Sequence, residues 1–150
     1  MKWNAFNAVG SGELGMLVQS GTRTSHRILC VDDEVVATTL RAEILREHGY
    51  SVSLFHCPFK ALESDLSAVD LALLDFHMPG MNGRELLLRM RAFGVPYPIL
   101  LLTGCLELLS YEDRVLFSRC LDKGKPVQDL LDSIWKFLDP DETPDWGCRK

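Results

Sequence analysis

Three aspartates follow apolar runs of this chain, where their carboxylates could bind a metal ion or react with phosphorus. Asp32 and Asp33 come after the apolar run 28–31, and Asp75 ends the run 71–74. Like charges a few ångströms apart raise one another's pKa unless a cation intervenes. Carboxylate oxygens suit Mg²⁺, and an ionised aspartate can attack a phosphoryl group. The three residues therefore indicate metal-assisted phosphoryl chemistry.

A hydroxyl group and two lysines complete the set of groups that such chemistry needs. Thr103 ends the apolar run 98–102, and the segment DKGKP at 122–126 contains Lys123 and Lys125. A metal ion, a lysine ammonium and a hydroxyl donor are the parts that hold a transferred phosphoryl group. Taken singly, each residue has a simpler interpretation: the first two aspartates as helix caps, Asp75 as a loop residue, and Thr103 as an ordinary strand end. The combination favours the chemical interpretation.

Strand and helix alternate along the chain, and this alternation positions the candidate residues. Short apolar runs predict strands covered on both faces, and apolar residues at helical spacing predict helices between them. The predicted strands are 27–31, 50–55, 71–75, 98–103 and 119–122, and the predicted helices are 34–48, 58–66, 83–93, 110–118 and 127–138. This pattern indicates an α/β fold with a parallel sheet and helices on both faces. Ligands of such sheets bind at the carboxyl ends of the strands, where the candidate residues stand.

Composition and charge limit the other classes of function. The chain has 150 residues, 47% of them apolar and 25% charged, as expected for a soluble globular protein. A net charge of −5 with no basic run argues against nucleic-acid binding. Its five cysteines form no CxxC pair and favour neither a zinc site nor a disulfide framework, so we expect a reducing cytoplasm.

The two ends of the chain differ from its centre. Residues 1–25 are rich in Gly, Ser, Thr and Asn, so we expect a flexible extension with a short helix near Leu14–Val18. No signal peptide is expected there, and no apolar run is long enough to span a membrane. Residues 139–150 contain two prolines and no periodicity, and we expect a flexible tail. One domain is therefore predicted over residues 26–138.

Four motifs in that domain resemble the receiver domain of bacterial two-component response regulators. They are VDDE at 31–34, LLDFHMPGMNG at 73–83, LLTG at 101–104, and a lysine after the fifth predicted strand. The order and spacing of the motifs match over about residues 26–138. The resemblance implies a CheY-like, flavodoxin-like doubly wound sheet of five strands in the order 2-1-3-4-5.

The resemblance also implies a role for each matching residue. Asp75 would be the phosphoacceptor and a ligand of Mg²⁺, the implied cofactor. Asp33 would bind this ion directly, Asp32 mostly through water, and His77 through its backbone carbonyl. Thr103 would donate a hydrogen bond to the attached phosphoryl group.

The lysine after the fifth predicted strand and the residue three positions before it match the family pattern less closely. Lys125-Pro126 matches the Lys-Pro dipeptide common in the family, but the distance to the leucine pair that starts at Leu130 favours Lys123, with Lys125 as the alternative. Three residues before that lysine, where the family usually has Tyr or Phe, stands Cys120. We therefore expect no aromatic switch, and the segment 103–123 is shorter than usual.

The implied function is a phosphorylation switch in the cytoplasm, not an enzyme acting on other molecules. The phosphoryl donor would be a sensor histidine kinase or a phosphotransfer protein, and a protein of unknown identity would be the downstream target. No output domain is expected after residue 138, no membrane is involved, and phosphorylation could drive formation of a homodimer. The alternative is a pseudo-receiver, an interaction module that works without phosphorylation. A phosphatase of the haloacid dehalogenase type is disfavoured, because it needs a second aspartate where His77 stands.

Overall fold

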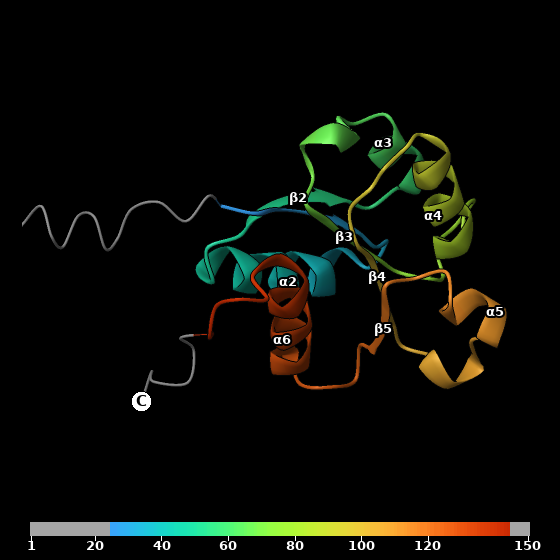
Figure 1. The fold of residues 1–150 in the computed structure, drawn as a ribbon. Helices are drawn as coiled ribbons and strands as arrows, with labels where there is room; N and C mark the ends of the chain where they lie inside the picture. The colour runs from blue at the N-terminus through green and yellow to red at the C-terminus, as the bar shows by residue number, and fades with distance from the viewer. Residues whose placement is uncertain (1–24, 145–150) are drawn as a thin grey trace, which may run out of the picture.

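Five parallel strands form a single sheet in the computed structural model, which describes residues 25–144 (Figure 1). The strands are β1 (Arg27–Val31), β2 (Ser51–Phe55), β3 (Leu71–Leu74), β4 (Ile99–Thr103) and β5 (Arg119–Asp122). Their order is β2-β1-β3-β4-β5, which confirms the predicted flavodoxin-like sheet. The strand order changes direction between β1 and β3, so the carboxyl ends of these two strands flank the point where such sheets bind ligands.

Helices cover both faces of the sheet (Figure 1). The helices α2 (Val35–Glu47) and α6 (Val127–Leu138) lie on one face, and α3 (Pro58–Leu62), α4 (Gly83–Ala92) and α5 (Tyr111–Arg114) lie on the other. Two short 3₁₀ turns complete the chain, η1 (Leu66–Ala68) and η2 (Leu106–Leu108).

The core consists of two apolar layers, because successive strand residues point to opposite faces of the sheet. The layer under α2 and α6 contains Ile28, Cys30, Leu71, Leu73, Leu100, Leu102, Leu45, Leu130, Leu131 and Ile134. The layer on the other face contains Leu29, Val31, Ala72, Leu74, Ile99, Leu101, Leu86, Leu87 and Met90. Both faces of the central strands are thus buried, as their unbroken apolar runs predict.

The buried face of α2 is not the one that its apolar spacing indicates. Val36 and Leu40 have the helical spacing, yet they are 83% and 63% exposed. The buried residues are Thr38, Ala42 and Leu45. The hydroxyl of Thr38 donates to the carbonyl of residue 34, which satisfies this polar group inside the core.

The predicted helices 58–66 and 110–118 are too long. The first ends at Leu62 and is followed by η1, and the second is a single turn, Tyr111–Arg114, preceded by η2. The side chain of Ser110 caps α5 by accepting a hydrogen bond from the amide of Asp113. Leu66 and Phe117 extend the apolar pattern past these helices, because both are buried although they lie outside the helices.

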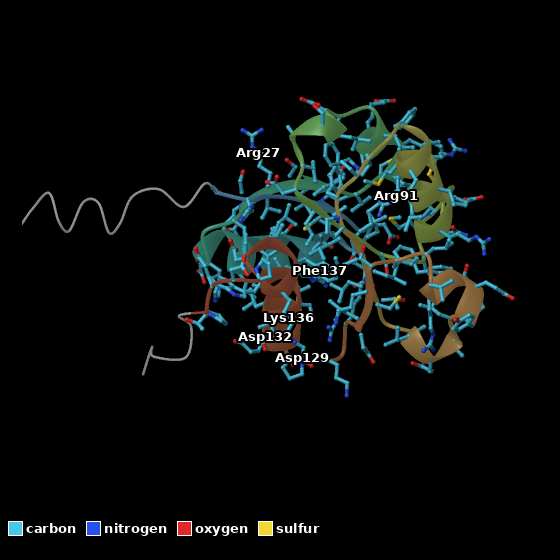
Figure 2. The ribbon with its side chains drawn as sticks, in the orientation of Figure 1. Arg27, Arg91, Asp129, Asp132, Lys136 and Phe137 are labelled. Carbon is cyan, nitrogen blue, oxygen red and sulfur yellow. The ribbon has the colours of Figure 1, made fainter. Side chains whose placement is uncertain are left out.

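The segment after α6 keeps contact with the domain as far as Glu142. The indole of Trp135 donates to the carbonyl of Glu142 at 2.8 Å, and His26 Nε2 lies 2.9 Å from Asp139 Oδ1. Within α6, the labels of Lys136, Asp132 and Asp129 follow one another along the helix from top to bottom in Figure 2. The helix predicted near Leu14–Val18 lies outside the described residues.

Two expected absences can be examined over residues 25–144. The four cysteines in this range, at positions 30, 57, 105 and 120, are free thiols. Within the same range, none of the helices has the length and apolar character needed to cross a membrane. The strands and helices of the described residues lie between Arg27 and Leu138, and the domain bounds of 26–138 stay a prediction.

Candidate functional site

Three carboxylates meet at the carboxyl ends of β1 and β3. Asp32, Asp33 and Asp75 each have an oxygen within 4.8 Å of the others. Backbone bonds fix two of them in the sheet, because the amide of Asp75 donates to Val31 and the amide of Asp32 donates to Phe55. The sheet therefore brings together the residues that the sequence places at its strand ends.

The turn after Asp75 explains the glycine at position 83. A Cβ atom on Gly83 would lie 2.4 Å from the carbonyl oxygen of Asp75, closer than any side chain tolerates. The Gly83 amide donates to the carbonyl of Phe76 at 2.8 Å, which closes the turn. Asn82 then caps α4 and forms a capping box with Glu85. The sharp loop thus starts a helix while leaving the Asp75 carboxylate at the sheet edge.

Lys123 reaches into this carboxylate cluster from the end of β5. Its Nζ lies 2.9 Å from Asp32 Oδ2, 3.3 Å from Asp75 Oδ1 and 3.5 Å from Glu34 Oε1. Its side chain is 13% exposed. Lys125 is exposed and lies beyond the turn that its amide forms with Asp122. The geometry favours Lys123 over the alternative lysine.

The charges in the cluster shift one another's pKa. Burial raises the pKa of Asp75, the charge of Asp32 raises it further, and Lys123 opposes both effects. Burial alone lowers the pKa of Lys123, but the hydrogen bond to Asp32 and the charge of Asp75 outweigh it, so this pKa is raised. The surroundings thus stabilise the charged form of Lys123, whereas Lys123 does not fully offset the cost of burying the charged form of Asp75.

A divalent cation fits this donor set. Three carboxylates with one shared lysine leave an excess of negative charge, and oxygen ligands in this number suit Mg²⁺. His77 is exposed beside the cluster, and its ring packs edge-on against Phe76 with centroids 5.1 Å apart. The role of its backbone carbonyl as a metal ligand stays a prediction.

Thr103 ends β4 next to the lysine. Thr103 is 1% exposed, and its carbonyl accepts a hydrogen bond from the amide of Lys123 at 2.9 Å. Its hydroxyl oxygen accepts from the amide of Cys105 at 3.4 Å. Because the hydroxyl oxygen accepts in this bond, its hydrogen can be donated to an oxygen bound at the sheet edge.

Cys120 occupies the strand position where the family that the sequence resembles usually has an aromatic ring. It pairs with Leu101 in the sheet register, and its sulfur lies 3.6 Å from the carbonyl of Arg114. Burial raises the pKa of this thiol. A thiol of this size fills a fraction of the space that a tyrosine ring would need.

Arg41 is a part of the cluster that the sequence analysis missed. Its Nη1 lies 3.3 Å from Asp32 Oδ2, and its side chain is 15% exposed. Arg41 precedes Ala42 and lies one helical turn from Thr38 and Leu45, both buried. The position of Arg41 on the same face as Thr38 and Leu45 could have indicated that it points toward the sheet. The apolar residues on another face of α2 suggested a different buried face.

A groove lies between α2 and α6. Its lining includes Leu40 and Ile44 from α2 and Val127 from α6, and also the charged residues Arg41 and Lys123. Leu40 is 63% exposed and Val127 is 41% exposed. Leu40 thus lines a surface groove instead of the core, and Ile44 lies between the groove and the core.

One family model and several curated proteins match this chain. A family model described as the response regulator receiver domain matches residues 28–122. Sporulation initiation phosphotransferase F of Bacillus subtilis (strain 168) is 27% identical over 117 residues, which are 76% of this chain and 94% of that protein. The regulatory protein VanR of Enterococcus faecium is 38% identical over 81 residues, or 53% of this chain and 35% of VanR. The matched part is thus a minor share of some curated relatives.

Solved structures share the fold over most of the chain. The response regulator protein TrrA of Thermotoga maritima, in complex with Mg(2+)-BeF, has a TM-score of 0.69 at 31% identity, covering 75% of this chain and 99% of that one. A CheY-like receiver domain protein from Methanospirillum hungatei JF-1 has a TM-score of 0.68 at 27% identity, covering 78% and 96%.

Proposed function

This chain belongs to the response regulator receiver domains, and we propose that it receives a phosphoryl group on Asp75 in a reaction that depends on Mg²⁺. The observation that carries the proposal is the cluster of Asp32, Asp33 and Asp75 with Lys123 3.3 Å from the Asp75 carboxylate. Acceptance of a phosphoryl group on aspartate is general in this family. The complex of TrrA with Mg(2+)-BeF supports the same ligands here.

The transfer needs a nucleophile and partners for the phosphoryl oxygens. An oxygen of ionised Asp75 forms a bond to phosphorus while the bond between phosphorus and the donor's imidazole nitrogen breaks. The imidazole keeps the bonding electrons and takes up a proton. Lys123 and Thr103 then hold oxygens of the new acyl phosphate, because both can donate to the same sheet edge.

The metal ligands would be Asp33 and Asp75, with Asp32 acting through water and His77 through its carbonyl. Bound Mg²⁺ neutralises charge on the phosphoryl oxygens. Asp33 is the most exposed of the three aspartates, so its carboxylate can bind an ion that enters from solvent. Burial, together with the charge of Asp32, raises the pKa of Asp75, and a divalent ion bound beside it would favour the ionised carboxylate.

The phosphoryl donor would be a histidine kinase or phosphotransfer protein that docks on the groove between α2 and α6. Lys123 lines this groove and contacts Asp75 at 3.3 Å, so an apolar helix seated on Leu40 and Val127 would bring its histidine toward Asp75. Similarity to the sensor histidine kinase GacS of Pseudomonas protegens, 31% identical over 111 residues, supports a role in this type of pathway. Location in the cytoplasm, the downstream protein and a phosphorylation-dependent homodimer stay predictions, as does action without an output domain.

A pseudo-receiver that works without phosphorylation is the second candidate. Cys120 in place of an aromatic ring and the single turn of α5 favour it. The complete set of Asp32, Asp33, Asp75, Thr103 and Lys123 favours the phosphorylated switch.

Incubation with acetyl phosphate and Mg²⁺, read on a phosphate-affinity gel, tests the proposal. A retarded band is expected for the wild-type chain and not for Asp75→Asn or for a sample without Mg²⁺. Absence of the band, while calorimetry shows Mg²⁺ binding, would contradict phosphorylation and favour the pseudo-receiver.

A further inference from the structure

Two cations share one oxygen of Asp32. Oδ2 of this carboxylate lies 2.9 Å from Lys123 Nζ and 3.3 Å from Arg41 Nη1. Oδ1 accepts a hydrogen bond from the amide of Glu34 at 2.9 Å. Asp32 thus has three donors, and two of them are charged.

Arg41 and Lys123 share Asp32 but differ in their other contacts. Lys123 also contacts Asp75 and Glu34, so it lies among the carboxylates. Arg41 pairs with Asp32 and lines a small cavity together with Asp32, Asp75 and core residues of β1, β3 and β4. An oxygen attached to Asp75 would therefore compete with Asp32 for Lys123, while Arg41 can keep its contact with Asp32.

Arg41 offsets negative charge at the buried part of the phosphorylated site. Asp32 and Asp33 contribute two negative charges, a phosphoryl group contributes about two more, and the exposed carboxylate of Glu34 lies 3.5 Å from Lys123. A divalent metal ion and Lys123 supply three positive charges, and Arg41 supplies the fourth. Without Arg41, the excess of negative charge beside the buried carboxylate of Asp32 is larger by one, which is costly.

We propose that Arg41 is a positioning residue that keeps Asp32 neutralised and in place when Lys123 transfers its contact to the phosphoryl group. The inference rests on the proposed function, because it needs both the metal ion and the phosphoryl group. Two effects of opposite sign follow. The positive charge of Arg41 weakens binding of the metal ion alone, and it strengthens binding of the phosphoryl group once the metal is present.

Arg41→Met and Arg41→Lys test this inference, because the first removes the charge but keeps an unbranched side chain, and the second keeps the charge. Calorimetry gives the dissociation constant of Mg²⁺, and a second titration at saturating Mg²⁺ gives that of beryllofluoride, a mimic of the phosphoryl group. For Arg41→Met we expect Mg²⁺ to bind about fivefold more tightly and beryllofluoride about fivefold more weakly. Arg41→Lys should return both constants to within about twofold of wild type.

The opposite signs separate this role from a structural one. Arg46→Met removes another cation from α2, and both constants should then stay at the wild-type values. Thermal unfolding of every variant checks that the fold is retained. Equal weakening of both ligands by Arg41→Met, or no change in either, would overturn the inference. Failure of the wild-type chain to bind Mg²⁺ would contradict the proposed function itself. This outcome differs from a failure of the Arg41 inference, in which the wild-type chain binds Mg²⁺ and only the variants depart from expectation.

Discussion

The ammonium of Lys123 lies 3.3 Å from the carboxylate of Asp75, and this contact joins the end of β5 to the end of β3. The contact is short because the sheet holds both residues at the same edge. It also places Lys123 where an oxygen attached to Asp75 would be.

Replacement of Lys123 should therefore impair phosphorylation, and replacement of Lys125 should not. Lys123→Met removes the cation beside Asp75, so we expect the rate of phosphorylation by acetyl phosphate to fall about 100-fold. Lys125→Met changes an exposed side chain and should stay within about twofold of wild type. Phosphate-affinity gels at timed intervals measure both rates. The reverse order of effects would assign the role to Lys125.

Gly83→Ala should destabilise the protein strongly. The added Cβ would lie 2.4 Å from the backbone oxygen of Asp75, which cannot move away without distortion of the turn. We expect the free energy of unfolding to fall by about 3 kcal/mol in urea denaturation. Gly104→Ala is the matched control, since a Cβ there has no atom within 4 Å, and a change of less than about 0.5 kcal/mol is expected. Similar losses in the two variants would refute the steric explanation.

Asp113→Asn should reduce stability in a manner that depends on pH. Asp113 pairs with Arg84 at 2.8 Å and thereby links α5 to α4. Hydrogen bonds from Arg84 and Ser110 lower the pKa of Asp113 below its value in the unfolded chain. The folded state thus binds this proton less tightly, so the stabilisation is complete above the unfolded pKa and is lost as the pH falls through the lowered pKa.

Urea denaturation at two pH values measures this difference. At pH 7 the variant should lose about 0.5 kcal/mol, a small value because the pair is partly exposed to solvent. Near pH 3 the loss should shrink. Glu112→Gln removes a charge from the same turn without breaking the Arg84 contact and should leave stability unchanged. A loss that does not vary with pH would exclude the ion pair as its cause.

Leu40→Asp should separate the two types of phosphoryl donor. The new charge lies in the groove between α2 and α6, where an apolar partner would be seated, and the side chain is exposed enough for the fold to tolerate it. Transfer from a phosphohistidine protein should slow about tenfold, and the reaction with acetyl phosphate should change by less than about twofold. Phe93→Asp, at an exposed position after α4, is the control. Equal slowing with both donors would mean that the substitution disturbs the site itself.

Much of this arrangement could be predicted because local pattern determines it. Unbroken apolar runs identify the central strands, and Asp32, Asp75 and Thr103 stand where those runs end. Gly83 belongs to the turn that follows Asp75, which the motif at 73–83 also indicates. Arg41 could not be found in this way, since its role depends on which face α2 turns toward β1. The exposure of Val36 and Leu40 likewise depends on which face α2 turns toward the sheet.

The single turn of α5 affects how the far edge of the sheet can respond. Terminal amides and carbonyls of a helix lack partners within it, and a helix of four residues consists almost entirely of termini. Such a segment opens locally at little free-energy cost, so its amide hydrogens should exchange with solvent much sooner than those of β4. A rearrangement that starts at Thr103 would therefore be absorbed by partial unfolding of this segment, instead of being transmitted by a helix that moves as a rigid lever.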